Sequence, residues 1–239
     1  MIDLTRKPFH FLPLKNDPCF DLSCEFTISL IETIDLYYNE LIEVSKKITE
    51  ELPKVDFYLY KRSFFLIENI VDAYSKLSNS INISLGVPTK TMKNPIKIFD
   101  NFSYSPNKSL QTDVRLMRNS SQHFEERIQK FPTKVDPFLE LFYKEENVSW
   151  HIKFGKGGHS HNGQKNNNTI FNIESMQFKS YIILDYKIIS ITIKVADIYK
   201  DTLEMLNLIE ENMNQIINKK GFCCPPARNV STFITLNNI

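Results

Sequence analysis

The chain has 239 residues, of which 42% are hydrophobic and 24% charged, and its formal net charge is +1. This composition is ordinary for a globular protein and excludes a chain that is disordered throughout. A net charge so close to zero gives no general attraction to nucleic acid or to a membrane surface, so any such binding needs a local patch. Six glycines, four of them within residues 155–163, favour helices over a turn-rich β-fold.

The sequence also limits the cellular setting. Residues 1–15 lack the apolar core and small-residue cleavage site of a signal peptide, so none is expected. No run of about 18 uncharged apolar residues is present, which predicts a cytoplasmic protein that does not span a membrane. Cys19, Cys24, Cys223 and Cys224 are too few for a disulfide scaffold. We expect reduced thiols and no cofactor; the alternative is a metal site shared by the two pairs, whose spacing matches no standard zinc pattern.

Residues 1–22, punctuated by three prolines, are predicted to form an irregular N-terminal arm. A long helix is then expected to begin with Ser23 as its N-cap and to end at Pro53. Its apolar stripe recurs at intervals of four and three residues and comprises Phe26, Leu30, Ile34, Tyr37, Leu41, Val44 and Ile48.

A second helix is predicted from residue 55 to residue 83, antiparallel to the first because the connection around Pro53 is short. Its apolar face comprises Leu59, Phe64, Ile67, Ile70, Val71, Tyr74, Leu77 and Ile81. Residues 86–107 hold three prolines and show no clear period, which indicates a long connection.

A third helix is predicted over residues 108–130 and ends before Pro132. Its apolar stripe comprises Leu110, Val114, Met117, Ser121, Phe124, Ile128 and Phe131. Because serine is small, Ser121 at a stripe position would allow a neighbouring helix to approach closely.

Residues 138–184 change character and are predicted to form a β-insertion. Short aromatic and β-branched runs alternate there with a polar tip rich in Gly, His and Asn. The last helix is expected to begin at Asp185 as its N-cap and to run to Lys219, leaving residues 221–239 as a tail. The predicted fold class is therefore mainly α. One domain, residues 1–239, forms an antiparallel bundle of about four long helices with a small β-hairpin or meander before the last.

The third helix carries the most chemically specific run of the chain, residues 118–123 with the sequence RNSSQH. On a helical wheel of about 100° per residue, a polar face lies opposite the apolar stripe. That face comprises Arg115, Asn119, Gln122, His123 and Glu126. Arg118 lies on the flank, about 140° from His123, so one straight helix does not bring the two side chains together. A two-fold dimer could bring two such helices, and four side chains, to one place.

Arg118 followed by Asn119 and, after three more residues, His123 resembles the Arg-x4–6-His motif of the HEPN superfamily of small helical domains. The aromatic-acid-acid-Arg run that follows, residues 124–127, is similar to a bacterial branch of that superfamily. The predicted helical bundle is consistent with the family, whereas the β-insertion departs from its minimal bundle.

This resemblance implies a homodimeric endoribonuclease that cleaves RNA without a metal, through attack of the ribose 2′-hydroxyl on the adjacent phosphodiester. It implies a toxin–antitoxin or antiphage role, with an antitoxin or another protein as a possible partner. His123 would move a proton, because imidazole titrates near neutral pH. Arg118 would stabilise the charge on the phosphate oxygens, and Asn119 would orient either group.

Other residues would support this site. Glu126, one turn beyond His123, could fix the imidazole tautomer, Gln122 lies on the same face, and Arg115 would add phosphate affinity. Lys153, Lys156 and Lys165 could give the β-insertion a basic edge for RNA. His159 and His161 could bind a metal with His151, although the sequence around them favours a polar hairpin tip. The alternative function is a non-catalytic helical module that dimerises and binds RNA or a protein.

Overall fold

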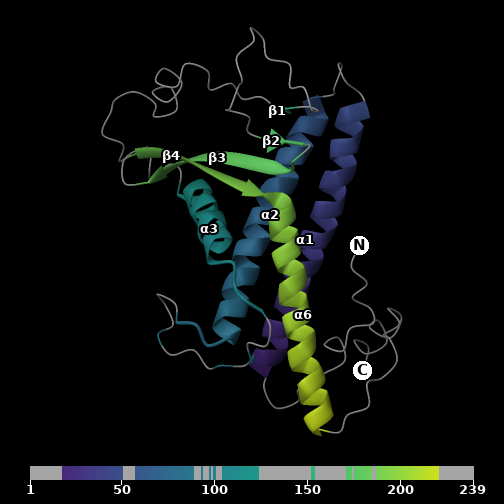
Figure 1. Ribbon diagram of the computed structural model, residues 1–239, viewed down its shortest axis with the longest axis vertical. Coiled ribbons are helices and arrows are strands. Elements are labelled where there is room, and N and C mark those ends of the chain that lie inside the picture. The colour runs from purple at the N-terminus through teal and green to yellow at the C-terminus, as the bar shows by residue number, and fades with distance from the viewer. Residues whose placement is uncertain are drawn as a thin grey trace.

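The computed structural model describes residues 18–50, 57–88, 93, 97, 99–100, 104–123, 152–153, 171–173, 175–184 and 187–220. Within these residues the helices are α1 (Pro18–Glu50), α2 (Phe57–Ser84), α3 (Lys108–Gln122) and α6 (Val195–Lys220). The strands are β1 (Ile152–Lys153), β2 (Phe171–Asn172), β3 (Gln177–Leu184) and β4 (Lys187–Lys194). The predicted fold class is confirmed: the chain is mainly helical, with a small sheet before the last helix (Figure 1).

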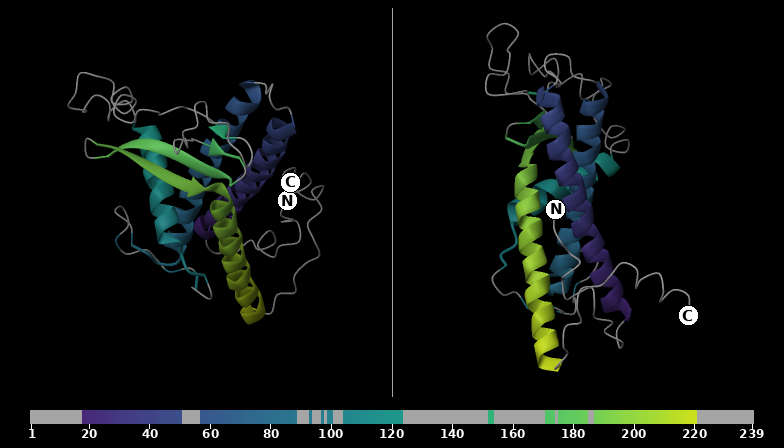
Figure 2. Two further views of the ribbon diagram at one scale, coloured as in Figure 1. Left: turned by 45° about the horizontal axis from the view of Figure 1, so that its top comes forward. Right: turned by 90° about the vertical axis from the view of Figure 1, so that its right-hand side faces the viewer.

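Two long helices, α1 and α2, form the base of the bundle and lie side by side, and α6 packs against both (Figures 1 and 2). Their apolar stripes face one another, as the spacing of the sequence predicts. The side chains of Ile34, Leu41, Ile48, Tyr74 and Ile81 are completely buried. The core is continuous from these helices to the sheet, because Ile182 and Ile193 belong to the same cluster of buried residues.

The start of α1 corrects the sequence prediction in two respects. The helix begins at Pro18 and not after Ser23, because proline is well tolerated in the first turn, where its missing N–H has no helical partner. Phe26, predicted for the apolar stripe, is 50% exposed. Thr27 and Ile28 are buried instead, and the Thr27 hydroxyl lies 2.8 Å from the hydroxyl of Ser80 on α2.

Gly86 ends the second helix and turns the chain toward α6. It has a φ of 76°, and the backbone N–H groups of Gly86 and Val87 donate to the carbonyls of Ile83 and Asn82, which is a Schellman cap. An added Cβ at Gly86 would lie only 3.1 Å from the Cβ of Lys97, so the position requires glycine for its conformation and for its space.

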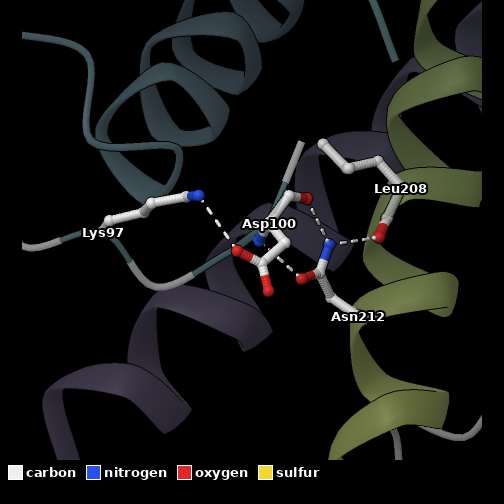
Figure 3. A network of polar contacts seen from close by, with 4 residues as sticks. All are labelled: Lys97, Asp100, Leu208 and Asn212. Carbon is white, nitrogen blue, oxygen red and sulfur yellow. Dashed lines mark hydrogen bonds and ion pairs between the residues drawn. The ribbon is translucent and has the colours of Figure 1, made fainter. Parts of the chain in front are cut away.

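Buried Asn212 fixes the connection after α2 to α6 (Figure 3). Its Oδ1 accepts from the backbone N–H of Asp100 at 2.8 Å, and its Nδ2 donates to the carbonyls of Asp100 and Leu208 at 3.0 and 2.9 Å. Lys97 forms an ion pair with the Asp100 carboxylate at 2.9 Å. These contacts set the point from which the chain enters α3.

The third helix begins where expected. Asn107 is its N-cap, and the Asn107 side chain accepts a hydrogen bond from the backbone N–H of Leu110 at 3.1 Å. The buried positions are Leu110, Val114, Met117 and Ser120. At its C-terminal end the buried stripe therefore includes Ser120 in place of the predicted Ser121, which is exposed. The predicted stretch beyond residue 123, with Glu126, lies outside the described residues.

The sheet extends further than the predicted β-insertion, which was expected to end at residue 184. Residues 187–194, predicted as the first turns of the last helix, form strand β4, so Asp185 is not the N-cap of a helix. The run is rich in isoleucine, whose β-branched side chain favours strands, and it pairs antiparallel with β3 over its whole length. The β2–β3 and β3–β4 pairs are antiparallel, whereas the short β1 pairs with β2 in parallel.

The sheet packs on α3, with the C-terminal end of that helix beneath the β3–β4 hairpin (Figure 1). Ile182 of β3 and Ile191 and Ile193 of β4 are buried. Most of the predicted β-insertion, including its polar tip, and the tail at residues 221–239 lie outside the described residues. No helix among those described is both long and apolar enough to cross a membrane.

A candidate nucleic-acid site at the end of helix α3

The polar face predicted for the third helix is present in the structure. Arg115, Gln122 and His123 are exposed, and Asn119 is half-buried. Arg118, predicted on the flank between the two faces, is also half-buried, with a side-chain exposure of 23%. Lys153 lies in β1, whereas Glu126, Lys156 and Lys165 lie outside the described residues.

Arg118 is held in position by a residue that the sequence did not single out. Its Nε donates to Oδ1 of Asp72 on α2 at 2.7 Å. The other carboxylate oxygen of Asp72 lies 2.6 Å from the ammonium group of Lys76, one turn further along α2. Within the described residues, the Arg118 guanidinium uses its Nε for the contact with Asp72. Its two terminal nitrogens therefore remain available for a further acceptor, such as a phosphate oxygen.

The two cations also affect the ionisation of Asp72. Partial burial opposes loss of its proton, but the hydrogen bonds and positive charges of Lys76 and Arg118 outweigh that effect and lower the pKa of Asp72 below its ordinary value. The carboxylate is thus charged at neutral pH. It orients Arg118 and at the same time offsets part of its positive charge.

The ion pair predicts a pH-dependent effect of Asp72→Asn on stability. Because the folded state lowers this pKa, the stabilisation is present above the ordinary aspartate pKa of about 3.9 and is lost as the pH falls through the lowered value. Asp72→Asn should cost no more than about 1 kcal/mol at pH 7, because solvent screens a pair this exposed. Urea unfolding of the wild type and of Asp72→Asn from pH 7 to pH 3 should show that the difference between their free energies of unfolding shrinks in acid. A difference that grows in acid would contradict this explanation.

A pocket of roughly 350 Å³ opens beside Arg118 between α2, α3 and β3. Its volume is at the small end of the range for ligand pockets. The walls carry Arg118 and Gln122 from α3, Phe65, Glu68 and Asp72 from α2, and Phe178 from β3. The structure therefore brings two of the predicted residues, Arg118 and Gln122, to one cavity with aromatic side chains.

His123 occupies a different position. It is the C-cap of α3, its backbone N–H donates to the carbonyl of Asn119 at 3.1 Å, and its side chain is exposed. It is not among the residues that line the pocket, and neither are Arg115 and Asn119. One protomer thus presents Arg118 inside a pocket and His123 outside it, at the same end of the same helix.

The described residues contain no group of three or more His, Cys, Asp or Glu side chains arranged to hold a metal ion. The chain matches no protein-family model, and comparisons with curated proteins and with solved structures found no match either.

Proposed function

We propose that this protein is a HEPN-like endoribonuclease that cleaves RNA without a metal at a site assembled by two copies of the chain. The observation that carries the proposal is the end of α3, where an arginine oriented by Asp72 lines a pocket and an exposed histidine of the same helix lies outside it. An oriented cation and a proton-transferring group are the two functions that phosphodiester cleavage by a neighbouring hydroxyl requires. Asn119, between them in sequence, would orient either group.

In the proposed reaction, the ribose 2′-oxygen forms a bond to phosphorus and the bond from phosphorus to the 5′-oxygen breaks. His123 accepts the proton of the 2′-hydroxyl and then gives a proton to the departing 5′-oxygen. The terminal nitrogens of Arg118 stabilise the negative charge that develops on the non-bridging phosphate oxygens. The products are a 2′,3′-cyclic phosphate and a 5′-hydroxyl.

A dimer is proposed because the arginine and the histidine of one chain point to different sides of α3. The wheel separates them by about 140°, and the lining of the pocket agrees, since it includes Arg118 and leaves out His123. A two-fold axis near the end of α3 would place His123 of one copy beside Arg118 of the other. Such an enzyme would act on cytoplasmic RNA, and a protein partner could restrain it.

A non-catalytic RNA-binding module is the second candidate, and the ion pair between Arg118 and Asp72 favours it. The carboxylate oxygen lies 2.7 Å from Nε and offsets part of the positive charge that a phosphate would meet. An arginine held in this way can position a backbone phosphate without promoting its cleavage.

The experiment that tests the proposal is cleavage of labelled single-stranded RNA by the full chain in the presence of EDTA. We expect cleavage without added metal, with fragments that end in 2′,3′-cyclic phosphates. Lys108→Ala, at the opposite end of α3, is the matched control and should cleave as well as the wild type. Binding of RNA without cleavage would favour the non-catalytic module, and cleavage that requires a divalent metal would contradict the proposed chemistry.

A further inference from the structure

The pocket beside Arg118 contains more than the proposed chemistry uses. Phosphate cleavage requires Arg118, but the lining also includes two phenylalanines and a glutamate, which have no role at a phosphate. A carboxylate would in fact repel a phosphate placed next to it. This part of the pocket therefore suits an uncharged, planar and hydrogen-bonding group.

From these features we infer that the pocket is a base-binding subsite, and that it takes an unpaired guanine next to the cleaved phosphate. The choice of RNA as the ligand rests on the proposed function, whereas the choice of base rests on the pocket residues. Phe65 supplies a stacking surface, Glu68 reads the Watson–Crick edge, and Arg118 holds the adjacent phosphate.

Phe65 is suited to stacking because it is exposed and yet fixed in place. It is 46% exposed, so part of its ring is open to solvent. Its ring packs edge-on against Tyr37, with centroids 6.3 Å apart, and the Arg62 guanidinium lies 5.0 Å from its centroid. Phe178 on β3 is fixed in the same way by an edge-on contact with Phe64 at 6.3 Å. Rings held by their neighbours lose little conformational freedom when a base stacks on them.

Glu68 determines which base fits. Its side chain is exposed and has no recorded hydrogen bond or ion pair with any residue that the structure describes. A carboxylate only accepts hydrogen bonds, through two oxygens. Guanine alone among the four bases presents two adjacent donors, N1–H and the 2-amino group, on its Watson–Crick edge. Adenine and cytosine place an acceptor beside their amino group, and uracil places a carbonyl on each side of its N–H, so each of them would bring an oxygen or nitrogen lone pair against the carboxylate.

Gln122 and Arg118 on α3 complete the recognition. The Gln122 side chain on α3 is exposed, lines the same pocket and can donate to the guanine O6. The terminal nitrogens of Arg118, directed by its Nε contact with Asp72, are available to the neighbouring phosphate. The volume of roughly 350 Å³ is large enough to admit one base.

The test measures binding of 2′-fluoro pentanucleotides, which lack the attacking hydroxyl and therefore separate base recognition from cleavage. The central position is guanine, inosine, adenine or cytosine, and uridines flank it. We expect guanine to bind at least about tenfold more tightly than inosine, which lacks the 2-amino donor to Glu68. Glu68→Gln should remove the preference for guanine, because an amide offers one acceptor and one donor.

Phe65→Ala should weaken binding of every oligonucleotide by about 5- to 100-fold, because it removes the stacking surface. Phe26→Ala, a phenylalanine of similar exposure on α1, and Glu211→Gln, an exposed glutamate on α6, are the controls and should bind as the wild type. Equal affinity for the four central bases, or a guanine preference that survives Glu68→Gln, would overturn the inference. A guanine preference in a protein that does not cleave RNA would leave the subsite standing and remove the proposed nuclease activity.

Discussion

Replacing His123 with glutamine is expected to lower the rate of metal-free RNA cleavage by about 10²- to 10⁴-fold, the usual contribution of a positioned acid–base group. Glutamine keeps a hydrogen-bonding side chain of similar size at the C-cap of α3 but transfers no proton at neutral pH. Because the His123 side chain is exposed, the substitution should leave folding intact. The cleavage rate and the unfolding curve of the same sample together provide the measurement.

Arg118→Lys is expected to lower the same rate by about 10²- to 10³-fold, because lysine keeps the charge but cannot contact Asp72 and a phosphate at once. The variant also weakens the contact of residue 118 with Asp72 between α3 and α2, so its stability needs a control. Arg62→Lys weakens a comparable interhelical pair with Glu40, in which Nη2 lies 2.6 Å from the carboxylate, and should show a similar loss of stability. Cleavage that is unchanged in both His123→Gln and Arg118→Lys would remove the assignment of the site.

Tyr74→Phe is expected to produce the largest loss of stability from the removal of one oxygen atom. The Tyr74 side chain is completely buried, and its hydroxyl donates to Oδ2 of buried Asp201 at 2.5 Å, which joins α2 to α6. Removing a donor from a buried charged acceptor costs about 1.5–3 kcal/mol. Urea unfolding at pH 7 measures this loss.

The loss should depend on pH, with a sign set by Asp201. Burial raises the pKa of Asp201 above its ordinary value, and the hydrogen bond from Tyr74 partly offsets that rise. The contribution of Asp201 to the free energy of unfolding is therefore present below the ordinary aspartate pKa, and it is lost as the pH rises through the raised pKa of Asp201. Because the Tyr74 hydroxyl favours the charged form, Tyr74→Phe should cost more at pH 7 than at pH 4; an equal cost at both values would contradict this assignment.

Tyr199→Phe is the matched control for this prediction. The Tyr199 hydroxyl donates to Oδ1 of Asp35 at 2.7 Å, so the chemical change is the same. Each carboxylate keeps a second donor, Nδ2 of Asn39 at 2.9 Å for Asp35 and the Tyr104 hydroxyl for Asp201. We expect a smaller loss of stability in Tyr199→Phe than in Tyr74→Phe, because Tyr199 is half-buried whereas Tyr74 is completely buried.

Helical periodicity predicted much of this protein because it reflects which residues share a face. The stripe at Leu110, Val114 and Met117 is buried, and the opposite face with Arg115, Gln122 and His123 is exposed, as the wheel requires. The same reasoning was wrong at Ser121 because the buried stripe turns toward Ser120 at the end of α3.

Two features could not be predicted from periodicity. Ile188, Thr192 and Val195 fit helical spacing, but residues 187–194 pair with β3, and a single sequence does not show pairing partners. Asp72 was missed for a similar reason: its spacing from Lys76 indicates only an exposed helix face, and its contact with Arg118 joins residues that are far apart in the sequence. The β4 run does carry a signal in its β-branched composition.

Mixing two inactive variants tests whether each catalytic site is built from two chains. A 1:1 mixture of Arg118→Ala and His123→Ala, allowed to exchange subunits, should recover about one quarter of wild-type cleavage, because half of the dimers are mixed and each of these has one intact site. That recovery would show that Arg118 of one copy works with His123 of the other. Exchange without any recovered cleavage, although the wild type is active, would contradict a site shared between copies.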